Sequence, residues 1–167
     1  MTKPQNILYI MSDEHNPKML GCYGHNQVLT PNLDKLAARG TRFNAHYTNS
    51  PICIPARAAF ATGRYTHETG YWDNAMPYDG EVKGWGHRLQ EEGMRVESIG
   101  KLHYLRDDLN TGFSEQHHPM HVMDGIGQVR GSVRDPLPDE RTAQMLTKIG
   151  PGESSYNNYD RLIADEA

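Results

Sequence analysis

The sequence predicts an α/β fold in which a largely parallel sheet is flanked by helices. Two short segments, at about residues 6–11 and 94–99, are predicted to be strands, and the first is a short apolar run of the kind found in buried parallel strands. Helical patterns with start and stop signals occupy about residues 31–40, 55–63 and 84–92. Alternation of strand and helix along a chain indicates a parallel sheet joined by crossover helices.

Composition narrows the classes of protein that this chain can represent. Its 167 residues are enough for one globular domain, and a net charge of -4 argues against bulk nucleic-acid binding. Two cysteines exclude a disulfide framework and a cysteine-rich zinc site. Mean hydropathy is -0.75, and no apolar run approaches the roughly 18 residues of a membrane-spanning helix. The apolar run near the N-terminus is too short for a signal peptide, so we expect a cytoplasmic protein without a membrane partner.

The first predicted helix has clear signals at both ends. Thr30 is suited to cap its N-terminus, and Pro31 is suited to its first position. Leu33 and Leu36 form an apolar stripe, and Gly40 is a natural stop. We therefore expect a helix over residues 31–40.

The next segment brings a cysteine close to a helix start. Residues 41–47 alternate between apolar and polar side chains, which predicts an extended segment. Pro55 is suited to open a short helix that stops at Gly63. Cys53 then lies close to the N-terminus of this helix, where the helix dipole and free N–H groups favour a developing anion.

Two chemically reactive side chains follow the predicted strands. Asp13 comes just after the first strand, and Lys101 comes just after the strand at 94–99. Open α/β sheets bind their ligands at the carboxyl ends of parallel strands. The pattern therefore predicts a functional site at this edge of the sheet.

The remainder of the chain has weaker periodicity. Residues 106–151 are rich in Pro, Gly, Asp and His and are expected to form an irregular excursion over the sheet edge. Residues 156–167 have apolar positions at helical spacing, and the pattern stops without a cap, which suggests a shortened chain. His117, His118 and His121 lie within five residues, but Pro119 limits the geometry, so we do not interpret them as a metal site.

Four ordered motifs resemble type I sulfatases of the alkaline phosphatase superfamily, in their N-terminal portion. The family pattern Cys-x-Pro-x-Arg, followed after four residues by Thr-Gly, stands here as Cys-Ile-Pro-Ala-Arg-Ala-Ala-Phe-Ala-Thr-Gly from Cys53 to Gly63. Residues 6–13 resemble the family's first strand with its Asp, residues 30–37 its Thr-Pro-Asn-Leu-Asp helix, and residues 100–103 its Gly-Lys-x-His segment. The resemblance is strong over the first 105 residues.

The resemblance implies hydrolysis of small-molecule sulfate esters through an oxidised cysteine. In the family, a formylglycine-generating enzyme converts the motif cysteine, here Cys53, to an aldehyde that hydrates to a diol. One hydroxyl attacks sulfur and the alcohol leaves; the second hydroxyl then expels sulfate and restores the aldehyde. A divalent metal, most often Ca²⁺ with Mn²⁺ or Mg²⁺ as alternatives, would be held by Asp13 and residue 53.

The resemblance also assigns roles to four other residues. Arg57 would hold the diol and stabilise charge, and Lys101 would bind the sulfate oxygens. His103 would hydrogen-bond residue 53 and assist breakdown of the sulfated intermediate. Asn74 falls where related hydrolases place a substrate-binding asparagine.

Some features depart from the family pattern and leave alternatives open. Many sulfatases have Asp-Asp where this chain has Asp13-Glu14, and they take further metal ligands from later in a longer chain. We therefore expect residues 1–167 to be the N-terminal part of a catalytic domain, with core elements in 1–105 and an excursion and terminal helix in 106–167.

Two other functions are compatible with these motifs. A phosphonate monoester or phosphodiester hydrolase of the same superfamily would share the cysteine motif, although such enzymes commonly lack the Lys-x-His segment. An inactive fragment with an incomplete metal site is the other alternative. Whether the chain forms a homo-oligomer is left open by the sequence.

Overall fold

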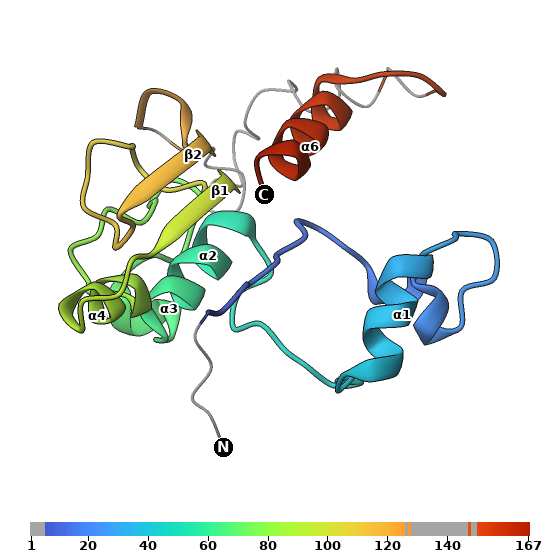
Figure 1. The fold of residues 1–167 in the computed structure, drawn as a ribbon. Coiled ribbons are helices and arrows are strands. Elements are labelled where there is room, and N and C mark those ends of the chain that lie inside the picture. Colours follow the sequence, from blue (N-terminus) through green and yellow to red (C-terminus); the bar gives the residue numbers. More distant parts are fainter. Residues whose placement is uncertain (1–5, 126, 128–146, 148–149) are drawn as a thin grey trace. The chain divides into compact units, whose positions relative to one another are not determined.

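The computed structural model describes residues 6–125, 127, 147 and 150–167. The chain divides into two compact units, residues 1–47 and 48–167, and each is described by itself. Figure 1 shows their helices and strands along the chain. The second unit contains the sheet and most of the predicted site residues.

The first unit is built around helix α1 (Pro31–Arg39), as the sequence predicts. Gly40 is its C-terminal cap, but the Thr30 side chain makes no capping bond to the helix backbone. The Thr30 hydroxyl instead accepts the backbone N–H of Gly21 at 2.9 Å, and Asp34 accepts the N–H of Cys22 at 2.7 Å. Thr30 and Asp34 thereby attach α1 to the short 3-10 helix η2 (Gly21–Tyr23), which follows another, η1 (Pro17–Met19).

The strand predicted over residues 6–11 is not present in the structure. These residues are irregular, and the side chains of Ile7, Leu8 and Ile10 are about four-fifths exposed, at 77%, 83% and 77%. Residues 41–47 are likewise irregular. A strand exists only where a neighbouring strand completes its hydrogen bonds, so an apolar or alternating pattern alone does not produce one.

The second unit contains a two-stranded parallel sheet, β1 (Glu97–Lys101) and β2 (Glu115–Met120), which confirms a parallel α/β arrangement. The register pairs Ile99 with His117 and Lys101 with Met120, with an irregularity between Ile99 and Lys101. β1 begins and ends later than predicted, so Lys101 is its last residue and does not lie beyond the end of the strand.

Strand β2 lies inside the segment that was expected to be irregular. Its sequence, Glu-Gln-His-His-Pro-Met, has low strand propensity and contains a proline. Pairing with β1 supplies the backbone hydrogen bonds that hold this segment extended. A short edge strand tolerates proline at a position where no N–H is needed for the ladder. The rest of this segment falls largely outside the described residues.

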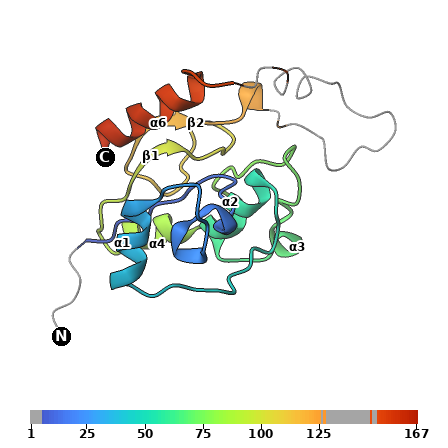
Figure 2. The same ribbon diagram turned by 90° about the vertical axis from the view of Figure 1, so that its right-hand side faces the viewer.

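In the second unit, helices α2 (Cys53–Thr62) and α4 (Trp85–Glu91) lie on one side of the sheet, as Figure 2 shows. The helix predicted at 84–92 is confirmed, and the one predicted to open at Pro55 begins two residues earlier. The short helices α3 (Thr66–Thr69) and η3 (Met123–Gly125) lie in the connections. Helix α6 (Ser155–Glu166) confirms the predicted terminal helix, with Ser154 as its N-cap.

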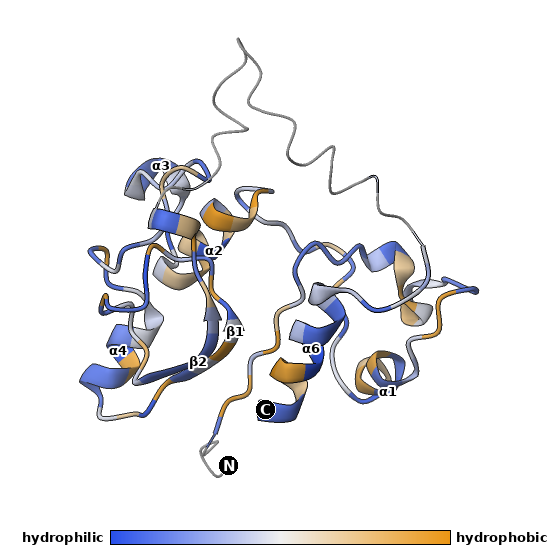
Figure 3. Ribbon diagram, turned by 90° about the horizontal axis from the view of Figure 1, so that it is seen from above, coloured by the Kyte–Doolittle hydropathy of each residue, from blue (hydrophilic) through white to orange (hydrophobic). Residues whose placement is uncertain are grey.

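The core of the second unit is aromatic. Tyr78 is fully buried, and its ring packs edge-on against Tyr71 and Tyr104, with centroids 5.5 and 4.8 Å apart. Burial, with the charge of Asp79 nearby, raises the pKa of Tyr78 to about 12, so its hydroxyl stays neutral and donates to the Val82 carbonyl. Figure 3 shows apolar residues in α2. Ala58 and Ala61 of this helix belong to the core cluster. No helix in the described ranges is long and apolar enough to span a membrane.

Close backbone packing makes Gly86 a sensitive position. A Cβ at this buried residue of α4 would lie 2.4 Å from the carbonyl oxygen of Gly112. Glycine to alanine normally stabilises a helix interior, but this clash reverses the sign. We expect Gly86→Ala to lower the free energy of unfolding by about 1–3 kcal/mol.

Tryptophan fluorescence during urea unfolding measures this change, since both tryptophans belong to the second unit. Gly150→Ala is the matched control, because nothing lies within 4 Å of a Cβ built there. Equal stability of the two variants would contradict the packing described for α4.

Candidate active site

Cys53 is the first residue of α2, and the structure shows why the helix begins there. Ile52 before it is extended and offers no side-chain cap. Asn74, from a distant loop, supplies the cap: its Oδ1 accepts the backbone N–H of Ile54 at 3.1 Å. Its Nδ2 lies 3.7 Å from the Cys53 Sγ. The half-buried Cys53 side chain therefore lies at a helix N-terminus beside a polar amide.

The loop that carries Asn74 is held by its own turn. Asp73 is buried, and its carboxylate accepts the N–H of Ala75 at 2.7 Å while its carbonyl accepts the N–H of Met76 at 3.0 Å. Gly127 packs so closely on the Asn74 carbonyl that any larger residue would overlap it. These contacts fix the direction in which the Asn74 amide faces residue 53.

Arg57 connects α2 to the sheet. It is one turn after Cys53, only 8% of it is exposed, and its Nη1 donates to the carbonyl of Lys101, the last residue of β1. Burial raises the pKa of the Tyr104 hydroxyl above its ordinary value, and the positive charge of Arg57 offsets part of this rise. The Cys-x-Pro-x-Arg motif and the Gly-Lys-x-His motif are thus physically joined.

The Gly100–His103 segment leaves the sheet through an unusual backbone path. Gly100 has φ 88° and His103 has φ 58°, both in the left-handed region. Glycine takes this conformation freely, whereas His103 is held there by its N–H, which donates to the Met120 carbonyl at 2.7 Å. Opposite Gly100 the ladder is irregular: the two steps from Ile99 to Lys101 pair with the three steps from His117 to Met120, so the extra residue lies in β2, where His118 has φ 48°.

Asp13 belongs to the first unit. It lies in a turn with Glu14, whose φ is 56°, directly after the segment that was predicted to be a strand. Among the described residues, no group of three or more His, Cys, Asp or Glu side chains has the arrangement needed to hold a metal ion.

The three histidines in and just after β2 each contact another side chain. His117 lies against Glu97 at 3.3 Å, and His118 lies 3.2 Å from Glu166. His121 contacts Gln116 at 3.0 Å, and burial lowers its pKa and favours the neutral ring.

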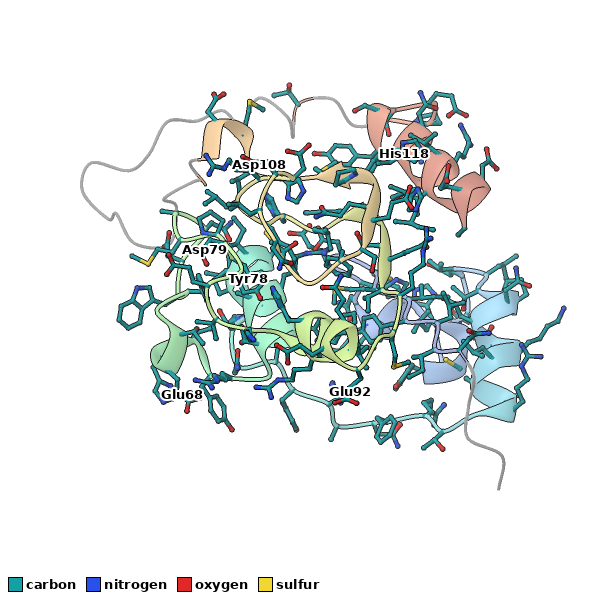
Figure 4. The ribbon with its side chains drawn as sticks, turned by 60° about the vertical axis from the view of Figure 1, so that its left-hand side comes forward. Glu68, Tyr78, Asp79, Glu92, Asp108 and His118 are labelled. Carbon is teal, nitrogen blue, oxygen red and sulfur yellow. The ribbon has the colours of Figure 1, made fainter. Side chains whose placement is uncertain are left out.

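Sequence reasoning missed the residues that support the site. The Asp-Asn pair at 73–74 is a turn signal, so the turn that orients Asn74 was recognisable in principle. Gly127 and Tyr104 carry no local signal, because their importance comes from neighbours far away in the chain. Figure 4 shows Tyr78 of the same core beside α2.

The geometry defines a class of α/β protein in which a cysteine begins a helix and an arginine of the same helix binds the end of a parallel strand. The sulfatase family model matches residues 5–167, so the chain belongs to the sulfatase family. It is 37% identical over 106 residues to N-acetylglucosamine-6-O-sulfatase of Bacteroides thetaiotaomicron, which covers 64% of this chain and 19% of that protein. It is 37% identical over 115 residues to choline-sulfatase of Rhizobium meliloti, covering 69% and 22%.

Solved structures show the same fold. The structure of the protein BT4656 in complex with its substrate D-glucosamine-2-N,6-O-disulfate matches this chain with a TM-score of 0.63 and 35% identity. The match covers 68% of this chain and 23% of the BT4656 chain. The phosphonate monoester hydrolase of Agrobacterium radiobacter matches with a TM-score of 0.53 and 24% identity, over 64% and 24%, which shows the fold alone. The chain spans about a fifth of the length of the curated relatives described above.

Removal of the Asn74 amide tests how α2 is capped. Asn74→Ala deletes the acceptor for the Ile54 N–H, so we expect the free energy of unfolding to fall by about 1 kcal/mol. Asn74→Asp retains an acceptor and places a negative charge at the positive end of the helix, so it should keep most of the stability.

Urea unfolding of the two variants and the parent chain provides the measurement. If Asn74→Asp loses as much stability as Asn74→Ala, the amide is not acting as a cap.

Proposed function

We propose that this protein hydrolyses sulfate esters, with residue 53 as the nucleophile in its formylglycine form. The observation that carries the proposal is the position of Cys53 as the first residue of α2. Asn74 caps this helix, and Arg57 of the same helix binds the backbone of Lys101. Membership of the sulfatase family supports the same reaction. The roles expected for Asn74, Lys101 and His103 remain part of this proposal.

The N-terminus of α2 suits a nucleophile that develops negative charge. Free N–H groups and the helix dipole favour an anion at this position, and a buried guanidinium one turn later adds positive charge. Lys101, at the end of β1, would provide a further cation for the oxygens of the sulfate group. Formylglycine at this position would supply a nucleophile that is regenerated after each turnover.

A divalent metal, Ca²⁺ or in its place Mn²⁺ or Mg²⁺, belongs to the proposal as a further expectation. Asp13 and residue 53 would each contribute an oxygen ligand, and hard cations prefer such donors. The modifying enzyme as a partner and the cytoplasmic location also stay predictions.

Intact-peptide mass spectrometry tests the modification directly. After co-expression with a formylglycine-generating enzyme, we expect the peptide carrying residue 53 to be about 18 Da lighter, since sulfur is exchanged for oxygen and two hydrogens are lost. The other cysteine, Cys22, is an internal control and should keep its thiol mass. An unchanged mass at residue 53, with a known sulfatase modified in the same cells, would contradict this nucleophile.

Substrate preference separates the two hydrolase candidates. With the complete protein, we expect kcat/KM for an aryl sulfate to exceed that for the matching aryl phosphonate monoester by at least about tenfold. Lys101→Ala should lower kcat/KM for the sulfate by about 100-fold, because it removes a cation that faces developing negative charge. Faster turnover of the phosphonate would favour the alternative function.

A further inference from the structure

Helix α6 presents only two half-buried side chains within the second unit. Tyr159 and Ile163, four residues apart and therefore on one face, are half-buried, whereas the other α6 side chains are exposed. Tyr156 and Leu162 on the same helix are 61% and 43% exposed. The face with Tyr159 and Ile163 is the one that contacts the sheet.

Ile163 packs against the backbone of Gly100. A Cβ built on Gly100 would lie 2.5 Å from the Cδ1 of Ile163, so the isoleucine occupies the space that any other side chain would need. Gly100, with φ 88°, lies in β1 opposite the irregularity of the ladder, where β2 has one extra residue. Ile163 therefore covers the point where the backbone turns toward Lys101.

Tyr159 binds the neighbouring strand. Its hydroxyl donates to the backbone carbonyl of His118 at 2.7 Å, and the His118 ring lies 3.2 Å from Glu166 at the end of the same helix. Figure 4 shows His118 on β2 beside α6. The helix is thus attached to β2 at two points separated by about two turns.

Charged groups complete the attachment. The His117 ring lies 3.4 Å from Glu166, and its other nitrogen faces Glu97 at 3.3 Å and Glu115 at 3.9 Å. Arg95 in turn pairs with Glu97 and Glu115. These pairs are exposed and add little stability singly, but they connect β1, β2 and α6 in one network.

We propose that α6 positions the Lys101–His103 segment, with Ile163 and Tyr159 as positioning residues for the reaction. Ile163 holds the backbone at Gly100, one residue before Lys101, and Tyr159 holds the strand whose Met120 carbonyl accepts the His103 N–H. A helix fixed to both strands keeps this irregular ladder from relaxing toward a regular one, and such a change would shift the backbone that carries Lys101 and His103. The catalytic consequence rests on the proposed sulfatase function.

Hydrogen exchange at single amides tests the positioning in the 167-residue chain without any activity. The His103 N–H is the reporter, and the Leu105 N–H, bonded to the Tyr78 carbonyl at 2.9 Å, is the reference for the core. We expect Ile163→Ala to speed exchange at His103 at least about tenfold relative to Leu105. Leu162→Ala, the matched control, should leave this ratio unchanged, and Ile163→Leu should restore most of it.

A milder pair of variants keeps the test valid if Ile163→Ala unfolds the chain. Tyr159→Phe removes one hydroxyl and should speed exchange at His103, whereas Tyr156→Phe should not. The proposal is overturned if either variant pair gives equal ratios, or if exchange at His103 and Leu105 rises together as in a general loss of stability.

Kinetics of the complete, modified protein then separate the two levels of inference. Ile163→Ala should lower kcat for an aryl sulfate about tenfold with KM changed less than about twofold, because substrate still binds but the catalytic groups are displaced. Ile163→Leu should recover most of kcat, and Leu162→Ala should retain it. If Ile163→Ala alters exchange at His103 but the parent protein has no sulfatase activity, the proposed function alone is rejected. If the parent is active but Ile163→Ala leaves exchange at His103 unchanged, the positioning role alone is rejected.

Discussion

The bond from the buried Arg57 guanidinium to the Lys101 carbonyl is the constraint on which the site of the second unit depends. It joins the helix that begins at Cys53 to the strand that ends at Lys101. A buried guanidinium needs such acceptors, because an uncompensated charge in the interior is strongly destabilising. The side chain that would stabilise charge in catalysis therefore also holds the two site motifs at a set separation.

A sheet of only two described strands needs support from elsewhere. Tyr71, Tyr78 and Tyr104 provide it, since large aromatic rings bury much surface for each residue ordered. Their buried hydroxyl groups remain neutral, and those of Tyr71 and Tyr78 donate to Asp79 and to the Val82 carbonyl. Ala58 and Ala61 of α2 belong to the same cluster, so the aromatic core gives this helix a rigid base, which a preorganised site requires.

Helices could be predicted from the sequence far better than strands. The helices at 31–39, 85–91 and 155–166 follow from local spacing and stop signals that act within a few residues. The strand expected at 6–11 and the unexpected β2 show the opposite case, because a strand depends on a partner that local sequence does not specify. The start of α2 at Cys53 also escaped prediction, since its cap comes from Asn74.

The sequence by itself determined the family, through four ordered motifs, and it identified Cys53, Arg57, Lys101 and His103 as candidate site residues. Their chemistry is a property of the side chains, so a linear pattern is enough to recognise it. Only the tertiary structure decided that Arg57 binds the end of β1, that Asn74 caps α2, and that α6 lies against Gly100. Those contacts join residues 20 to 63 positions apart, and such pairings are selected by packing and hydrogen-bond geometry, which no local pattern encodes.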